Sequence, residues 1–190
     1  MQRWVVNPYF TLVENAANLT TLYAGSRVDD FFNDRELLGA DRKAQERDAV
    51  NYMAGPLHFF LFDAGQHYIK LRYRYDANVA EGDDWDYSGH RFLFGTQYAV
   101  PWGDVRLRYD FDFHLHLHTN KDSLLPVTAP GTIRRYDREP IHLFSVSKDF
   151  TYKAQNFTVS VEYLLDNNAS NLAAYEYDRN VVTTSLTWRF

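Results

Sequence analysis

The amino-acid sequence predicts an all-β protein: an antiparallel up-and-down transmembrane β-barrel with about nine strands in this chain, part of an incomplete larger barrel. Three observations predict this class. Apolar and polar residues alternate in many segments, short and long connections alternate along the chain, and the last residue is aromatic. The mean hydropathy of −0.47 agrees with this class, because alternating barrel strands are not apolar on average.

The segment 105–118, VRLRYDFDFHLHLH, shows the alternation most clearly. Every odd position is aliphatic or aromatic, and every even position is charged or a histidine. A period of two residues indicates a β-strand, since successive side chains point to opposite faces. The segment is longer than the usual soluble strand of about 5–6 residues, whereas a strand that crosses a bilayer needs about 9–11. It therefore predicts one face toward lipid and one toward a watery lumen.

Eight further segments complete the predicted sheet. The alternation is clear in four of them and weaker in four, namely 67–76, 91–100, 156–164 and 181–190, and then 3–13, 19–31, 49–62 and 139–150. No segment has the periodicity of a convincing amphipathic helix.

The predicted connections alternate in length. The short ones contain turn-forming Gly, Pro, Asn or Asp in most cases, and the long ones are polar: 14–18, 63–66, 101–104 and 151–154 are short, and 32–48, 79–88, 119–137 and 166–178 are long. A soluble sandwich has no need of this asymmetry. Outer-membrane barrels have it, with short periplasmic turns and longer outer loops.

The alternation also assigns side chains to the two faces. The residues predicted to line the lumen are Lys70, Arg72, Arg74, Arg91, Arg106, Arg108, Asp110, Asp112, Glu162 and Arg189. The residues predicted to face lipid are Tyr73, Phe92, Phe94, Phe111, Phe113, Leu115, Val159 and Trp188. The basic residues could form an anion-selective constriction. Both signs of charge are present, however, so the sequence favours ion pairs that brace the wall.

Three histidines follow on the polar face, at positions 114, 116 and 118. Two imidazoles at i and i+2 can share a metal ion, and Asp110 or Asp112 could add oxygen ligands, which makes His114, His116 and His118 candidate ligands. Histidine is also a tolerated residue on a wet wall, and the sequence favours this simpler interpretation. Neither a metal nor another cofactor is therefore expected.

Two other candidate sites are weaker. The acidic loop residues Glu81, Asp83, Asp84 and Asp86 could bind calcium, but the sequence favours a solvated acidic outer loop. Ser145, His142 and Glu139 lie close in sequence, but positions 142 and 145 fall on opposite faces of a strand, so a catalytic triad fails there. No enzymatic activity is expected.

Composition limits the remaining classes of function. The net charge is −5, and no Lys/Arg cluster carries the interleaved aromatic residues of a nucleic-acid surface, so a nucleic-acid partner is not expected. Cysteine is absent, which excludes disulfides, thiolate metal sites and cysteine nucleophiles. The first residues, MQRWVVNPYF, lack the pattern of a secretory signal, so either the protein is not secreted or its beginning is missing.

The C-terminal strand ends in Leu186, Trp188 and Phe190 at alternate positions, which resembles the signal read by the bacterial outer-membrane barrel assembly machinery. The "EGDDWDYSGHR" loop, the "PWGD" turn and the "YDRNVV…WRF" ending resemble the C-terminal barrel of bacterial outer-membrane tetratricopeptide-repeat proteins. This resemblance covers nearly the whole chain, although no segment matches a tetratricopeptide repeat. It implies a membrane anchor or an export or transport conduit of a larger Gram-negative envelope protein. The implied partners are outer-membrane lipid, the assembly machinery, and a periplasmic repeat region or an exported cargo.

Strand counting predicts that residues 1–190 form one outer-membrane barrel domain that is truncated at its N-terminus. If Phe190 is periplasmic, the first of nine strands starts at the outer surface, whereas bacterial barrels normally have an even strand number with both ends periplasmic. Two alternatives stay open. One is a soluble lipocalin-like ligand-binding barrel, whose apolar face would lie inside; the other is an outer-membrane enzyme.

Overall fold

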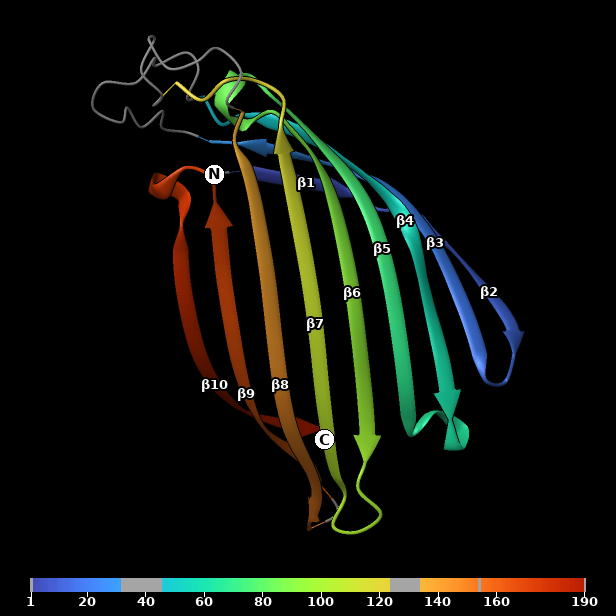
Figure 1. Cartoon of the computed structure of the whole chain (residues 1–190). Coiled ribbons are helices and arrows are strands. Elements are labelled where there is room, and N and C mark those ends of the chain that lie inside the picture. The colour runs from blue at the N-terminus through green and yellow to red at the C-terminus, as the bar shows by residue number, and fades with distance from the viewer. Residues whose placement is uncertain (1, 32–45, 124–133, 154, 190) are drawn as a thin grey trace.

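The computed structural model describes residues 2–31, 46–123, 134–153 and 155–189, and these residues form a single antiparallel sheet of ten strands (Figure 1). The strands are β1 (Gln2–Val6), β2 (Tyr9–Asn15), β3 (Asn18–Asp30), β4 (Ala49–Phe62), β5 (His67–Ala80), β6 (Tyr87–Ala99), β7 (Val105–His118), β8 (Tyr136–Tyr152), β9 (Gln155–Ser170) and β10 (Tyr177–Arg189). Within the described residues, no helix is long and apolar enough to cross a membrane.

Strands that follow one another in the chain also lie side by side from β3 to β10, which is the up-and-down order. Both β1 and β2 pair with β3, so together they occupy the predicted segment 3–13, which breaks at Asn7 and Pro8. Proline cannot donate to a ladder, so a break in an edge strand is where it is tolerated. The predicted all-β, antiparallel, up-and-down organisation is confirmed.

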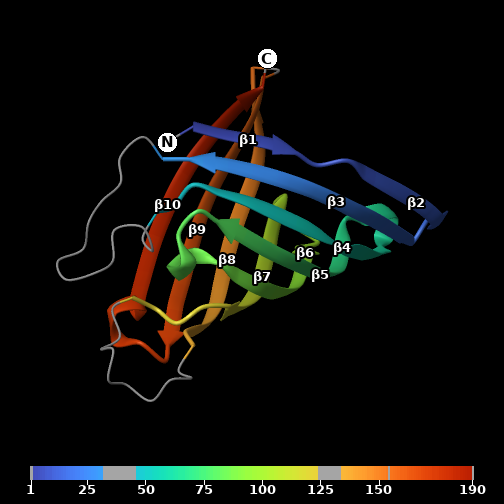
Figure 2. The same cartoon turned by 90° about the horizontal axis from the view of Figure 1, so that it is seen from above.

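The sheet is strongly curled but not closed (Figure 2). In the described part of the chain, its two free edges are the β1–β2 pair and β10. The shape is therefore barrel-like, with an open seam between the first and last strands.

The connections differ from the expected ones mainly in their ends. Strands β5 and β9 continue further than predicted, so the connections after them shrink to 81–86 and 171–176. Each contains one 3₁₀ turn, η3 (Asp83–Trp85) and η4 (Ala173–Tyr175) respectively, while the short turn at 63–66 contains η2 (Asp63–Gly65). The connections at the end of the sheet where long loops were predicted, which we call the long-loop end, are all still longer than the turns at the opposite end.

The two faces of the sheet have opposite chemistry. We call the side with the even positions of β7 the polar face, and the side with its odd positions the apolar face. Among the described residues no hydrophobic side chain is buried; the buried side chains are polar or charged: Asp29, Asn51, Asp76, Asp84, Asp110, Asp112, His114, His118, Asp122, Arg135, Asp137, Asp166 and Asn168. Large hydrophobic side chains on every strand are exposed.

Strand β6 leaves two gaps on the polar face, because glycines occupy two of its positions there. Gly95 lies in one rung of the ladder between Lys70 of β5 and Asp110 of β7. A Cβ atom at Gly95 would lie 2.2 Å from both the Asp110 Oδ1 atom and the Lys70 Cε atom. The missing side chain therefore allows the two neighbouring strands to pair their charges above β6.

Replacing Gly95 with alanine tests this packing. We expect Gly95→Ala to lower the free energy of unfolding by about 1–3 kcal/mol, because an added methyl group in a filled space forces its neighbours apart. Denaturant titration of the purified, folded protein measures the change. The control is Thr96→Ala, at the next position on the opposite face, and an equal effect of both substitutions would show that Gly95 has no special role.

Candidate functional site

The strongest feature of the polar face is a group of ion pairs across β5, β6 and β7. Asp112 accepts two hydrogen bonds from Arg91, from Nε to Oδ1 at 2.7 Å and from Nη2 to Oδ2 at 2.6 Å. The Arg72 Nη2 atom donates to the same Oδ2 atom at 3.1 Å. One carboxylate of β7 therefore binds guanidinium groups from β6 and from β5, the next strand but one, and the pair with Arg91 has the two-pronged geometry that makes arginine–carboxylate pairs strong.

Asp110, in the next rung of the polar face, also binds two cations, one from β5 and one from its own strand. Its Oδ1 atom lies 2.9 Å from the Lys70 Nζ atom, and its Oδ2 atom accepts from the Arg108 Nε atom at 2.7 Å. Two carboxylates therefore hold four cationic groups in this part of the face. The pairing supports the predicted bracing of the wall, and the surplus of positive charge would favour anions in any open lumen.

The other predicted lumen residues are less tightly held. The Arg74 Nε atom is 3.6 Å from Asp76, and the Arg106 Nη2 atom is 2.8 Å from Asp149 in a half-exposed pair. Glu162 lies on the polar face opposite Ser145 and Thr183. The side chain of Arg189 lies outside the part of the chain that the structure describes. Sequence reasoning missed Asp149 and also Asp166, which pairs with Arg179, because their partners are set by strand register.

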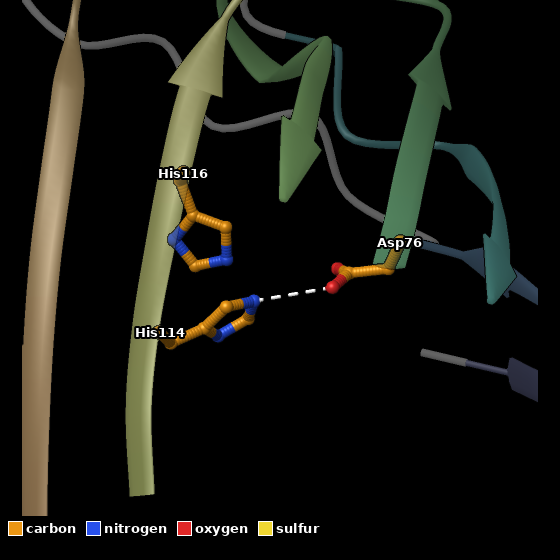
Figure 3. Close-up of side chains that lie close together, drawn as sticks. All are labelled: Asp76, His114 and His116. Atoms are coloured by element: carbon orange, nitrogen blue, oxygen red, sulfur yellow. Dashed lines mark hydrogen bonds and ion pairs between the residues drawn. The ribbon is translucent and has the colours of Figure 1, made fainter. Parts of the chain in front are cut away.

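The three histidines separate into two environments. His114 and His116 lie beside Asp76 of β5, with the His114 Nε2 atom 3.3 Å from Asp76 Oδ1 (Figure 3). His118 instead faces the Asp84 carbonyl oxygen, 3.1 Å from Nδ1, and Asp137 Oδ2, 3.4 Å from Nε2. Asp110 and Asp112, the expected oxygen ligands, are engaged by cations in the ion pairs described above.

Side chains from or next to all four long connections meet at one end of the sheet. The Trp85 and Tyr175 rings lie edge to face with centroids 6.4 Å apart, and Arg135 stacks over Tyr175 at 3.4 Å. Arg47 lies over Trp85 at 4.5 Å. We call these four residues the loop cluster. Burial and the nearby Asp122 raise the pKa of the Tyr175 hydroxyl well above its usual range, so this group is neutral at physiological pH.

The acidic loop contributes hydrogen-bond acceptors to the same end. Asp84 is buried and accepts from the Ser123 backbone N–H at 2.8 Å and from the Ser123 hydroxyl at 2.5 Å. Asp86 accepts from the Ala80 N–H at 2.6 Å. These carboxylates join the loops to one another, which gives them a role without calcium.

The eight residues predicted to face lipid all lie on the apolar face, as their strand register places them. Leu186 and Trp188 of the predicted assembly signal are 64% and 53% exposed there, whereas Phe190 lies outside the described residues. Histidines also lie on this face, and in two cases a tyrosine hydroxyl is 2.9 Å from the Nδ1 atom: Tyr73 with His90 and Tyr109 with His142. Ser145 lies on the polar face and His142 on the apolar face, as the two-residue period requires.

No protein-family model, curated protein or solved structure matches the chain. The resemblance to the barrel of tetratricopeptide-repeat proteins therefore stays a prediction.

The carboxylate of Asp112 provides the next prediction. We expect Asp112→Asn to lower the free energy of unfolding by about 2–4 kcal/mol, because it leaves Arg72 and Arg91 without their shared counter-charge in a largely buried place. Denaturant titration of the purified, folded protein measures the loss.

Asp149→Asn is the matched control. Its ion pair with Arg106 is about half exposed, so we expect a loss of at most about 1 kcal/mol. Equal losses for the two variants would contradict a bracing role for Asp112.

Proposed function

We propose that the chain is a membrane-embedded β-barrel domain of the outer membrane of a Gram-negative bacterium, serving as the anchor or the export or transport conduit of a larger envelope protein. The observation that carries this proposal is the distribution of side chains. Removal of apolar surface from water is the main force that stabilises a soluble fold, yet the described residues bury polar groups and expose the hydrophobic ones. A lipid environment removes this contradiction, because the apolar face is then shielded from water.

The height of the apolar band supports the same proposal. On the apolar face of β8, Arg138 and Lys148 are exposed, and none of the four positions between them is Asp, Glu, Lys or Arg: Pro140, His142, Phe144 and Val146. Ten steps of about 3.3 Å, on a strand tilted by about 40°, span roughly 25 Å along the membrane normal. This is the thickness of the apolar band of outer-membrane barrels, about 25 Å.

Exposed aromatic side chains gather at the short-turn end of the apolar face. Tyr98, Trp102, Tyr152 and Trp188 all lie there and are at least half exposed. Aromatic rings at the headgroup level are typical of transmembrane barrels.

The lipocalin-like alternative requires the reverse arrangement. Such a barrel would bury its aliphatic and aromatic positions around a ligand and expose the ion pairs of Asp110 and Asp112. Those carboxylates are buried, and Phe92 and Phe144 are 50% and 45% exposed. The enzyme alternative lacks support from Ser145, His142 and Glu139, because Ser145 and His142 lie on opposite faces of β8 and cannot belong to one catalytic triad.

The free edges also fit a domain of a larger protein. Lipid cannot hydrogen-bond to the unpaired backbone groups of β1, β2 and β10, so these edges need strand partners in a membrane. The proposal assigns these partners to further strands of the same protein. The ion pairs and the loop cluster occupy much of the polar side, which favours an anchor or a narrow conduit over a wide pore.

The first experiment is fractionation of Gram-negative cells that express the full protein with a secretion signal. We expect recovery in the outer membrane, extraction only by detergent, and heat-modifiable mobility on gels. Recovery as a soluble, folded protein without detergent would contradict the proposal.

A pair of arginine substitutions tests the lipid contact directly. We expect Phe144→Arg, in the middle of the band, to lower the free energy of folding into bilayers by about 2–4 kcal/mol, because a charge there enters hydrocarbon. Tyr152→Arg, beyond Lys148 and therefore outside the band, should cost at most about 1 kcal/mol. Both side chains are exposed, so in a water-soluble protein the two substitutions would be equally harmless.

A further inference from the structure

We propose that Asp76, His114 and His116 form a binding site for a divalent transition-metal ion of the zinc class, on the polar face toward the long-loop end. The ligand atoms of the three side chains all lie within 4.8 Å of one another (Figure 3). In a tetrahedral zinc site, ligand atoms about 2.0–2.1 Å from the metal are about 3.3 Å apart. The His114 Nε2 atom and Asp76 Oδ1 already have this separation, 3.3 Å, so only small side-chain movements are needed.

The register of three strands builds this arrangement. His114 and His116 are two residues apart on β7, so their rings lie on the same face, with centroids 3.7 Å apart. Asp76 of β5 occupies the same rung as His116, and Gly89 of β6 lies between them. A Cβ atom at Gly89 would lie 3.0 Å from Asp76 Oδ1, so glycine leaves the space that the carboxylate uses.

An unsatisfied nitrogen atom is independent evidence for a ligand. The Nε2 atom of His116 is buried and has no hydrogen-bond partner. Leaving a buried polar atom without a partner costs free energy, so most such atoms are paired. A metal ion would satisfy it.

Neighbouring groups hold His114 in the orientation that a metal requires. Its Nδ1 atom lies 3.7 Å from Glu139 Oε2, and the Tyr177 hydroxyl donates to Glu139 Oε1 at 2.5 Å. Metal-binding histidines commonly direct their second nitrogen to a carboxylate in this way. Arg91 lies opposite His114 on β6, but its guanidinium group is bound by Asp112. Arg74 is a further charged neighbour, and its Nε atom is 3.6 Å from Asp76, a long contact that a metal ion would replace.

The donor set selects the kind of metal. Two imidazoles and one carboxylate suit zinc, copper or nickel better than calcium or magnesium, which prefer oxygen ligands. Water would complete the coordination, since His118 is held by Asp84 and Asp137. The site goes beyond the anchor or conduit role and does not depend on it.

The test is calorimetric titration of the purified, chelator-treated protein in detergent with Zn²⁺ alone. We expect one ion per chain, and we expect His116→Gln and Asp76→Asn to weaken binding by roughly 100-fold or more, since partners of ligands alone account for about 10- to 100-fold. His142→Gln, on the opposite face, should leave the affinity unchanged.

Two outcomes would overturn the proposal: no saturable binding, or binding that His116→Gln and Asp76→Asn leave intact, which would mark an adventitious surface ion. If these variants fail to fold, Co²⁺ added to the unsubstituted protein still decides. The strong visible absorption of four-coordinate cobalt supports the site, and a spectrum of hydrated Co²⁺ refutes it.

Discussion

The two-residue period of the strands is the constraint on which the rest of the structure depends. In the antiparallel ladders from β5 to β7, the register places the charged residues of neighbouring strands on one face of the sheet. A slip of one residue in either of these ladders would move a strand's charged side chains to the apolar face. The charges of these strands therefore help to fix the register.

The same period explains what could be predicted from sequence. The limits of β7 coincide with the predicted segment 105–118, because its alternation is uninterrupted. Alternation fixes the face of each side chain but not its partner, since a shift of two residues preserves the faces. The pairing of Asp112 with Arg72 and Arg91, and the joining of Asp76 to the histidines, therefore required the structure. The loop cluster was not predicted, since it depends on the curvature of the sheet.

Bracing by ion pairs explains how a sheet without an apolar core can keep its shape. Taking charges out of water is costly, and this cost is recovered only where the geometry is good and each group is paired. Asp112 comes nearest to this condition, with two hydrogen bonds from Arg91 and one from Arg72 of β5. Asp110 also binds two cations, Arg108 and Lys70 of β5. These contacts reach over β6, so they hold together three strands rather than two, and they oppose flattening of the curled sheet.

The two glycines on the polar face of β6 leave room for two of the contacts between β5 and β7. In four successive rungs of the polar face that join β5, β6 and β7, Gly95 and Gly89 occupy the first and the last. Above Gly95 the pair is Lys70 with Asp110, and above Gly89 Asp76 meets the histidines of β7. A metal ion at the second gap would hold β5 to β7 as the ion pair does at the first. Because a metal ion can leave while a lysine cannot, the bracing would be permanent at one gap and dependent on metal supply at the other.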